Sequence, residues 1–156
     1  MSSGGLIDVQ GGTMKNDYAN ANWSANQGGL NVSANAYFDL RNNNVTVGAL
    51  TGAGSVYDNG FTNTLTVGAG NASGSYSGSI GLGGTTVVLT KTGTGTQTLT
   101  GNNVYSGATT VGGGTLEVAA GGVISNTSSS RWAVRPAPRC WSMAGRSRRV
   151  WRAGMA

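Results

Sequence analysis

The sequence predicts an all-β fold, and three observations support this prediction. Glycine accounts for 28 of the 156 residues, and Thr, Ser, Asn and Val are also abundant, a composition typical of short strands joined by tight turns. Apolar and polar residues alternate over several short runs, which is the period of a half-buried strand. No window within residues 1–130 places apolar residues at helical spacing.

Eight runs are expected to form strands, because β-favouring residues in each are flanked by Gly-Gly, Asn-Gly, Gly-Asn or Asn-Asn pairs. In chain order they are residues 6–9, 30–40, 44–50, 63–69, 85–91, 96–101, 108–111 and 115–118. In the second run, alternation places five apolar side chains on one face, namely Leu30, Val32, Ala34, Ala36 and Phe38. Leu116 and Val118 share a face in the last run. These faces need another layer to pack against.

A weak internal repeat indicates what that layer is. Leu65 matches Leu99 at an offset of 34 residues, and Tyr76 matches Tyr105 at an offset of 29, with the difference falling in a Gly/Asn/Ser loop. A solenoid tolerates insertions in its loops, because each coil packs only on its neighbours. We therefore expect about five or six coils of roughly 20 to 30 residues each. Leucines would form an internal ladder, threonines would face outward, and Gly and Asn would occupy corners that need a positive φ.

The net charge of +5 comes from one end of the chain. Residues 1–130 hold three basic and five acidic residues, whereas residues 131–156 hold seven arginines and no acidic residue. The first block therefore offers no basic groove, and we expect its fold to bind no nucleic acid. No apolar run approaches the ~18 residues of a membrane-spanning helix. The sole cysteine, Cys140, excludes a disulfide framework.

Residues 131–156 differ in composition from everything before them. They hold both prolines, three of the four tryptophans and the only cysteine, and they lack the Thr and Asn that pervade residues 1–130. We divide the chain accordingly into a repeat region, 1–130, and a basic tail, 131–156, that we expect to be irregular and disordered. Such a composition, rich in Arg, Ala, Gly, Pro and Trp, is typical of a GC-rich gene translated in the wrong reading frame, so our hypothesis is a frameshift near residue 130. A membrane- or nucleic-acid-binding segment is the alternative interpretation.

A longer motif lies within residues 89–118. It has the form L-x-K-x-G-x-G-x-x-x-L-x-G-x-N-x-Y-[ST]-G-x-T-x-[VI]-x-x-G-x-L. Its landmarks are Leu89, Lys91, Gly93, Gly95, Leu99, Gly101, Asn103, Tyr105, Gly107, Thr109, Val111, Gly114 and Leu116. This stretch resembles the autotransporter-associated β-strand repeat, also described as a passenger-associated repeat.

The resemblance implies a function as well as a fold. It implies a right-handed parallel β-helix from the passenger region of a type V secreted protein of Gram-negative bacteria. Such a chain would be a non-enzymatic structural stalk of an extracellular or surface-linked autotransporter, adhesin-related, with host or neighbouring-cell surface molecules as partners of the parent protein. The sequence shows no signal peptide and no alternating strands of an outer-membrane barrel, so we expect it to be a piece of a larger protein. Open strand edges at the ends of an isolated solenoid would favour self-association.

Catalytic chemistry finds little support in the sequence. The chain has no histidine, which excludes Ser-His-Asp, Cys-His and His–metal arrangements. Asp39 and Asp58 lie 19 residues apart, close to one coil, so they could stack as paired carboxylates, but each sits beside a turn where Asp caps the backbone. We expect no enzyme activity, no metal and no cofactor. Two alternatives stay open, a β-helical polysaccharide-active enzyme and a nonfunctional truncated gene product.

Four further side chains have two possible interpretations each. Lys91 and Glu117 are expected to be solvated or capping charges rather than ligand contacts. Tyr76 and Tyr105, at matched positions of the repeat, are expected to pack at a coil corner. Stacking of these two rings on carbohydrate is the alternative.

Overall fold

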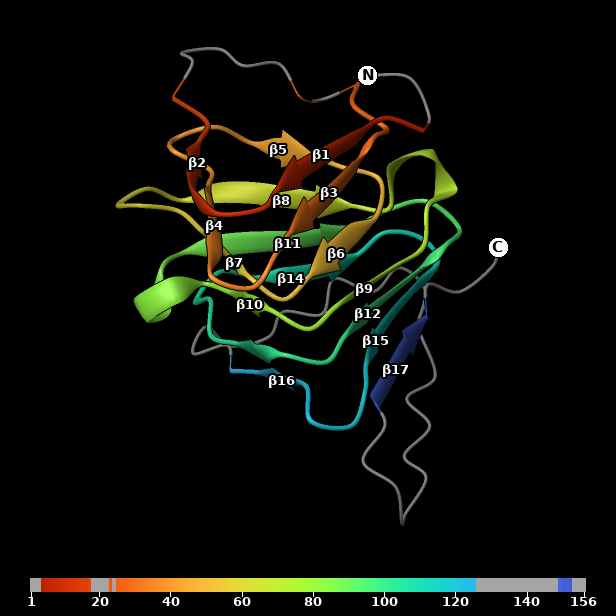
Figure 1. Cartoon of the computed structure of the whole chain (residues 1–156). Helices are drawn as coiled ribbons and strands as arrows, with labels where there is room; N and C mark the ends of the chain where they lie inside the picture. Colours follow the sequence, from red (N-terminus) through yellow and green to blue (C-terminus); the bar gives the residue numbers. More distant parts are fainter. Residues whose placement is uncertain (1–3, 18–22, 24, 126–148, 153–156) are drawn as a thin grey trace.

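The computed structural model describes residues 4–17, 23, 25–125 and 149–152. The described strands form three larger sheets, here called A, B and C, and a short two-stranded ladder (Figure 1). Sheet A contains β1 (Leu6–Val9), β3 (Gly29–Val32), β6 (Leu50–Gly52), β9 (Gly74–Tyr76), β12 (Thr96–Leu99), β15 (Thr115–Val118) and β17 (Arg149–Arg152). Sheet B contains β2 (Gly12–Lys15), β4 (Ala36–Asp39), β7 (Ser55–Tyr57) and β10 (Ser79–Ile80). Sheet C contains β5 (Val45–Thr46), β8 (Asn63–Val67), β11 (Val87–Lys91) and β14 (Thr109–Val111). The short ladder pairs β13 (Asn102–Asn103) with β16 (Val123–Ile124).

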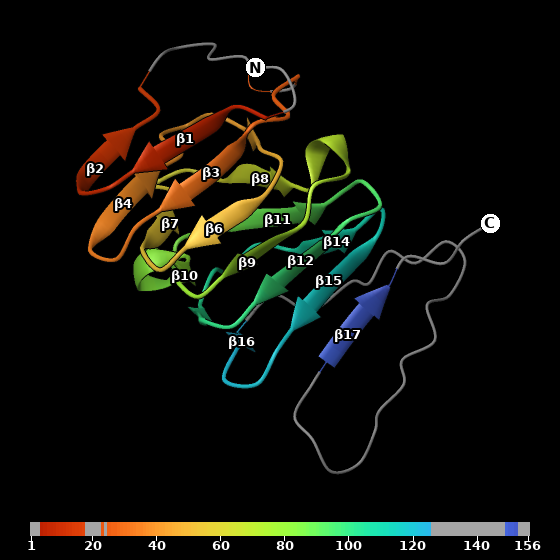
Figure 2. The same cartoon turned by 45° about the vertical axis from the view of Figure 1, so that its right-hand side comes forward.

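The chain winds as a solenoid. It passes from sheet A to sheet B to sheet C and returns to sheet A one strand further along, so that neighbouring strands of each sheet, except β15 and β17, pair in parallel. Paired residues lie 18 to 24 positions apart, and the stack makes about five turns. β13 continues the stack of sheet B, because Val104 N donates to the carbonyl oxygen of Ile80 at 2.9 Å. Figure 2 shows sheet A as a staircase from β1 to β15. The predicted all-β solenoid is confirmed.

Apolar side chains fill the space between the sheets. In sheet A one inner ladder runs through register-paired positions and consists of Val9, Val32, Gly52, Tyr76, Leu99 and Val118. Leu99 is fully buried, whereas the flanking Thr98 and Thr100 are partly exposed. This confirms the predicted arrangement of inward leucine and outward threonine, since a strand alternates its faces residue by residue.

The predicted strand 30–40 is two strands in the structure. β3 and β4 belong to different sheets, and the chain turns between them at Asn35, whose φ is 64°. Leu30 and Phe38 both point to the core, but Ala34 lies exposed at the turn. Asparagine tolerates the left-handed conformation, and this allows the sharp corner that period-2 alternation does not reveal.

The repeat alignment drawn from the sequence is wrong in its register. Leu65 pairs with Leu89 in sheet C, whereas Leu99 pairs with Tyr76 in sheet A. The similar TLT sequences therefore come from different sheets of the solenoid. Tyr105 lies in the loop between β13 and β14, away from the position of Tyr76 on β9. Strands of sheets A and C have the same alternation of apolar and polar residues, so sequence similarity alone does not tell a strand of one sheet from a strand of the other.

Six of the described strands before the tail lie wholly outside the predicted runs, namely β2, β7, β9, β10, β13 and β16, and β6 shares only Leu50 with the predicted run 44–50. These strands are two to four residues long and all except β16 contain Gly, Ser or Asn, so their alternation is too short to be recognised as a pattern. β17 falls within the tail expected to be disordered, and its four residues pair antiparallel with β15. The other residues of 131–156 lie outside the described residues.

Candidate functional site

The apolar landmarks of the motif line the core of the last described coils. Leu89, Leu99 and Leu116 are fully buried. In sheet C, Thr109 pairs with Leu89 and Val111 pairs with Lys91. Thr109 and Val111 are only partly buried, because β14 is the last strand of its sheet among the described residues.

Lys91 occupies an inner position where the neighbouring coils have valine. It pairs with Val67 on one side and Val111 on the other, and its exposed fraction is 0%. Its Nζ donates hydrogen bonds to the carbonyl oxygens of Thr92, Gly93 (3.3 Å) and Gly113 (3.4 Å). Burial lowers the pKa of the Lys91 ammonium below its usual value. The expected solvated lysine is wrong, and the capping interpretation is right, because the ammonium caps three carbonyls across two coils.

The motif glycines lie where two coils touch. A Cβ added at any of the five would fall 1.9 to 2.3 Å from a carbonyl oxygen, closer than any real Cβ comes to such an atom. The glycines are Gly93, Gly95, Gly101, Gly107 and Gly114. Only Gly93 and Gly114 have a positive φ. Close approach of the backbones, rather than the corner conformation predicted for all of them, is therefore the property that the five glycines share.

Asn103 is a buried bridge between coils. Its Oδ1 accepts from Ile80 N at 3.1 Å in the preceding coil, and its Nδ2 donates to Val123 O at 3.1 Å in the following one. Nδ2 also donates to Gly101 O at 3.0 Å. A fully buried amide needs such partners, because unpaired it would cost about 1–3 kcal/mol. Predicted as a corner residue, Asn103 instead joins three levels of the stack.

Tyr76 and Tyr105 are fully buried. The Tyr76 hydroxyl donates to Gly54 O at 2.8 Å, and the Tyr105 hydroxyl lies 2.6 Å from Thr109 Oγ1. Burial raises the pKa of Tyr105 to about 12 and raises that of Tyr76 still further. Neither ring is accessible, so the alternative that they stack on carbohydrate is wrong.

Gln97 is another buried amide, and no sequence pattern indicated its role. Its Oε1 accepts from Leu50 N at 3.1 Å and its Nε2 donates to Leu50 O at 2.9 Å, across 47 residues. Gly74 lies on the intervening strand, and a Cβ there would fall 2.7 Å from Leu50 O and 2.8 Å from Gln97 Oε1. Because Gly74 has no side chain, the Gln97 side chain reaches past the intervening strand and pairs with both the N–H and the C=O of Leu50. Gln97 is an unspecified position of the motif, which is why the pattern did not identify it.

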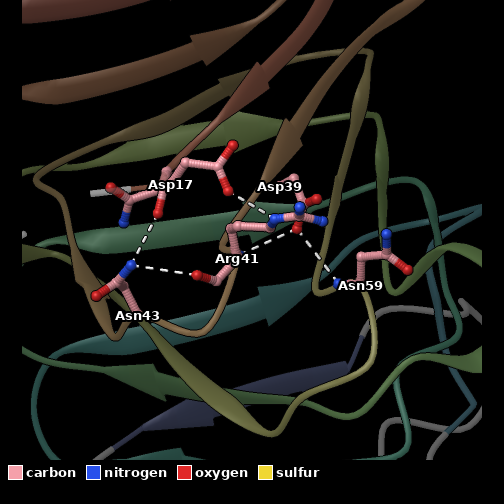
Figure 3. A network of polar contacts seen from close by, with 6 residues as sticks. Asp17, Asp39, Arg41, Asn43 and Asn59 are labelled. Carbon is pink, nitrogen blue, oxygen red and sulfur yellow. Dashed lines mark hydrogen bonds and ion pairs between the residues drawn. The ribbon is translucent and has the colours of Figure 1, made fainter. Parts of the chain in front are cut away.

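A network of exposed and buried polar groups occupies the corner between sheets B and C (Figure 3). Arg41 Nε donates to Asp17 Oδ1 at 2.6 Å, an ion pair whose side chains are 36% and 57% exposed, respectively. This contact raises the pKa of Arg41 above its usual value. Asp39 Oδ1 accepts from the backbone N of Arg41 at 3.0 Å and of Asn59 at 3.2 Å, and Asn43 Nδ2 donates to Arg41 O at 3.2 Å. Asp39 caps the turn as predicted, and it links two coils.

Two tyrosines lie beside this network on the outer face of sheet B. Tyr37 and Tyr57 stand on neighbouring strands with ring centroids 6.4 Å apart and planes at 86°, an edge-to-face pair. Tyr37 is 36% exposed. Burial and the nearby Asp39 carboxylate raise the pKa of Tyr57 above its usual value, which keeps its hydroxyl protonated. This pair could not be recognised in the sequence, because the two residues belong to strands 18 to 20 positions apart.

The carboxylates proposed for catalysis are not presented to solvent. Asp39 and Asp58 both have an exposed fraction of 0%. Asp58 Oδ2 accepts from Asn63 Nδ2 at 2.6 Å, so it too serves its own turn. Within the described residues, no group of three His, Cys, Asp or Glu side chains could hold a metal ion. In that same part of the chain, no helix is long and apolar enough to cross a membrane.

Comparison with known families decides what the motif is. Residues 89–118 match the family model of the passenger-associated transport repeat. This stretch is thus similar to the passenger-associated transport repeat. The match covers the five described strands from β11 to β15, so the repeat corresponds to one full coil with the beginning of the next.

One curated relative extends the similarity beyond the repeat. The chain is 37% identical over 134 residues to the adhesin BmaC autotransporter of Brucella suis biovar 1 (strain 1330). The alignment covers 81% of this chain and 4% of that protein. The chain therefore spans a small part of the length of the relative it matches. No solved structure matches the chain.

Proposed function

We propose that this chain is a non-enzymatic segment of an autotransporter passenger, displayed outside the cell and serving in adhesion. The passenger-associated transport repeat at residues 89–118 carries this proposal, and the similarity to an autotransporter adhesin agrees with it. The contribution of the segment is geometric. Its coils form a continuous core, and the corner between sheets B and C carries polar side chains such as those of Asp17 and Arg41. The parent protein would be secreted or linked to the cell surface, with surface molecules of host or neighbouring cells as partners.

Surface display tests this proposal. The full chain is placed in frame between a signal peptide and an autotransporter barrel, and surface exposure and adherence to cultured epithelial cells are measured. We expect display and adherence above those of the barrel alone. Leu99→Asp, which puts a carboxylate into the core, should abolish both, because an unpaired buried charge is strongly destabilising. Thr110→Asp, at an exposed position of β14, is the matched control and should preserve both. Display without any gain in adherence would contradict the adhesive part of the proposal.

The non-enzymatic part needs its own assay. The purified chain is incubated with a panel of polysaccharides, and the release of reducing ends and unsaturated products is followed. We expect no turnover, because Asp39 and Asp58 are enclosed by their turns. Cleavage that disappears in Asp39→Asn or Asp58→Asn would establish a polysaccharide-active enzyme instead.

The division of the chain at residue 130 remains part of the proposal. We propose that residues 1–130 are the repeat region and that residues 131–156 replace its native continuation. Sequencing the locus and translating the other frames tests this. A Gly/Thr/Asn-rich continuation in another frame would support the proposal, and the absence of one would refute it.

A further inference from the structure

The outer face of sheet B differs from the other outward faces in carrying paired aromatic rings. Tyr37 lies opposite Ser55 in register, and Tyr57 lies opposite Asp39. Their chain neighbours Phe38 and Val56 belong to the core, so alternation directs the tyrosines outward. An exposed ring that is not needed for the core marks a binding surface more readily than a buried one.

Polar groups of both signs adjoin the two rings. Asp39 lies opposite Tyr57 in register and accepts a hydrogen bond from the backbone N of Arg41 at 3.0 Å, so the Arg41–Asp17 ion pair lies near the tyrosine pair. Asp39 Oδ2 is buried and has no hydrogen-bond partner among the described residues. Ordered water completes such buried groups in most proteins, and because Asp39 has an exposed fraction of 0% it supports the surface from beneath and is not one of its contact residues. We call this set, Tyr37, Tyr57, Asp17, Arg41 and Asn59, the tyrosine surface.

We propose that the tyrosine surface binds an oligosaccharide, whose sugar rings stack on Tyr37 and Tyr57 and whose hydroxyl groups bond to Asp17, Arg41 and Asn59. The apolar C–H face of a pyranose packs on an aromatic ring, while its rim of hydroxyls needs carboxylate, guanidinium and amide partners. The tyrosine surface offers both, side by side. Because Asp17 and Arg41 neutralise one another, the surface suits a neutral saccharide better than a polyanion or a polycation.

The spacing of the solenoid supports the same ligand. Strands of successive coils repeat every ~4.8 Å, close to the length of one sugar residue within a chain. Tyr37 and Tyr57 stand on successive coils with centroids 6.4 Å apart and ring planes at 86°, so adjacent sugar residues would meet adjacent rings in an oligosaccharide that turns at the bond between them. The ligand chain would then run parallel to the solenoid axis. This inference deepens the proposed function and rests on it, since it names the class of surface molecule that the segment contacts.

A glycan array tests the inference on the purified full chain. The array carries immobilised neutral and uronic-acid oligosaccharides, and the best-bound neutral oligosaccharide is then used in calorimetric titration. We expect Tyr37→Ala and Tyr57→Ala each to weaken binding about tenfold or more, the effect of losing one ring stack. Tyr37→Phe, which retains the ring, should remain within about threefold of the wild type. Thr110→Ala, on the outer face of sheet C, is the control and should bind as the wild type does.

The outcomes separate this inference from the proposed function. Circular dichroism establishes that each variant is folded. A folded chain that binds no saccharide on the array overturns the inference, as does equal binding by the wild type and both alanine variants. Binding only to protein probes stripped of their glycans would also overturn it and would indicate a peptide ligand. Adherence of displaying cells together with a blank array would leave the adhesive role in place and refute the saccharide ligand alone.

Discussion

Replacement of Gln97 by leucine should cost far more stability than its place among unspecified motif positions suggests. Leucine has a similar volume and no hydrogen-bonding group, so Gln97→Leu removes the acceptor of Leu50 N and the donor to Leu50 O while leaving the core filled. Each buried group left unpaired costs about 1–3 kcal/mol. The sum is about 2–6 kcal/mol, a large fraction of the 5–15 kcal/mol that stabilises an ordinary domain.

Urea unfolding followed by circular dichroism measures this loss, at several protein concentrations so that self-association is recognised. Because coils can open separately in a solenoid, hydrogen exchange of the Leu50 amide provides a local measurement. Gln10→Leu, at an exposed position, is the matched control and should change stability by less than about 0.5 kcal/mol. A loss below about 1 kcal/mol in Gln97→Leu, with unchanged exchange at Leu50, would refute the idea that this amide completes the backbone pairing of sheet A.

Three further predictions follow from the repeat itself. Gly101→Ala should destabilise by more than about 2 kcal/mol, because the new Cβ would fall 1.9 Å from Gly78 O, whereas Gly112→Ala, with its nearest neighbour at 3.6 Å, should cost less than about 1 kcal/mol; equal melting temperatures would contradict this. Lys91→Met should destabilise by about 2–4 kcal/mol in urea, because three buried carbonyls lose a charged donor; unchanged stability would show that water replaces the ammonium. The pKa of Tyr105 is raised to about 12 from an ordinary 10.0, so the fold should lose about 2–3 kcal/mol of stability as the pH rises from 10 to 12. The melting temperature of Tyr105→Phe should depend less on pH in this range than that of the wild type. An equal dependence would exclude Tyr105 as the titrating group.

The kind of fold could be predicted from the sequence because apolar and polar residues alternate in the same way on several strands. Leu65 and Leu99 each stand between two threonines, which predicts that inward and outward residues alternate, and the structure confirms this because both leucines are fully buried. The turn at Asn35 was missed because alternation continues through it. A strand that changes sheets keeps its inward residues inward, so hydrophobic period alone does not locate the corners of a solenoid.

The hydrogen bonds of the buried polar side chains could not be predicted from the sequence, for a different reason. Gln97 and Asn103 bond to backbone atoms 47 and 20 to 23 residues away, and such partners are determined by the stacking register, not by local sequence. The register in turn depends on loop lengths, which vary between coils. Tyr37 and Tyr57 illustrate the same limit, because each looks like an isolated aromatic residue until neighbouring strands bring them together. Lys91 was visible as a motif landmark, but its burial depends on the corner carbonyls of two coils.

The parallel pairing of the strands has a mechanical consequence. Backbone hydrogen bonds between coils run along the solenoid axis, so tension applied along that axis loads the bonds of the outermost coil first and peels it away from the next. Each coil of 18 to 24 residues would release about 60 to 85 Å of extended chain. A tether built this way yields in steps, with each step absorbing work before the next coil is strained. Asn103 is bonded to the levels on either side, so the coil that contains it, in the middle of the repeat motif, would resist pulling more strongly than its neighbours.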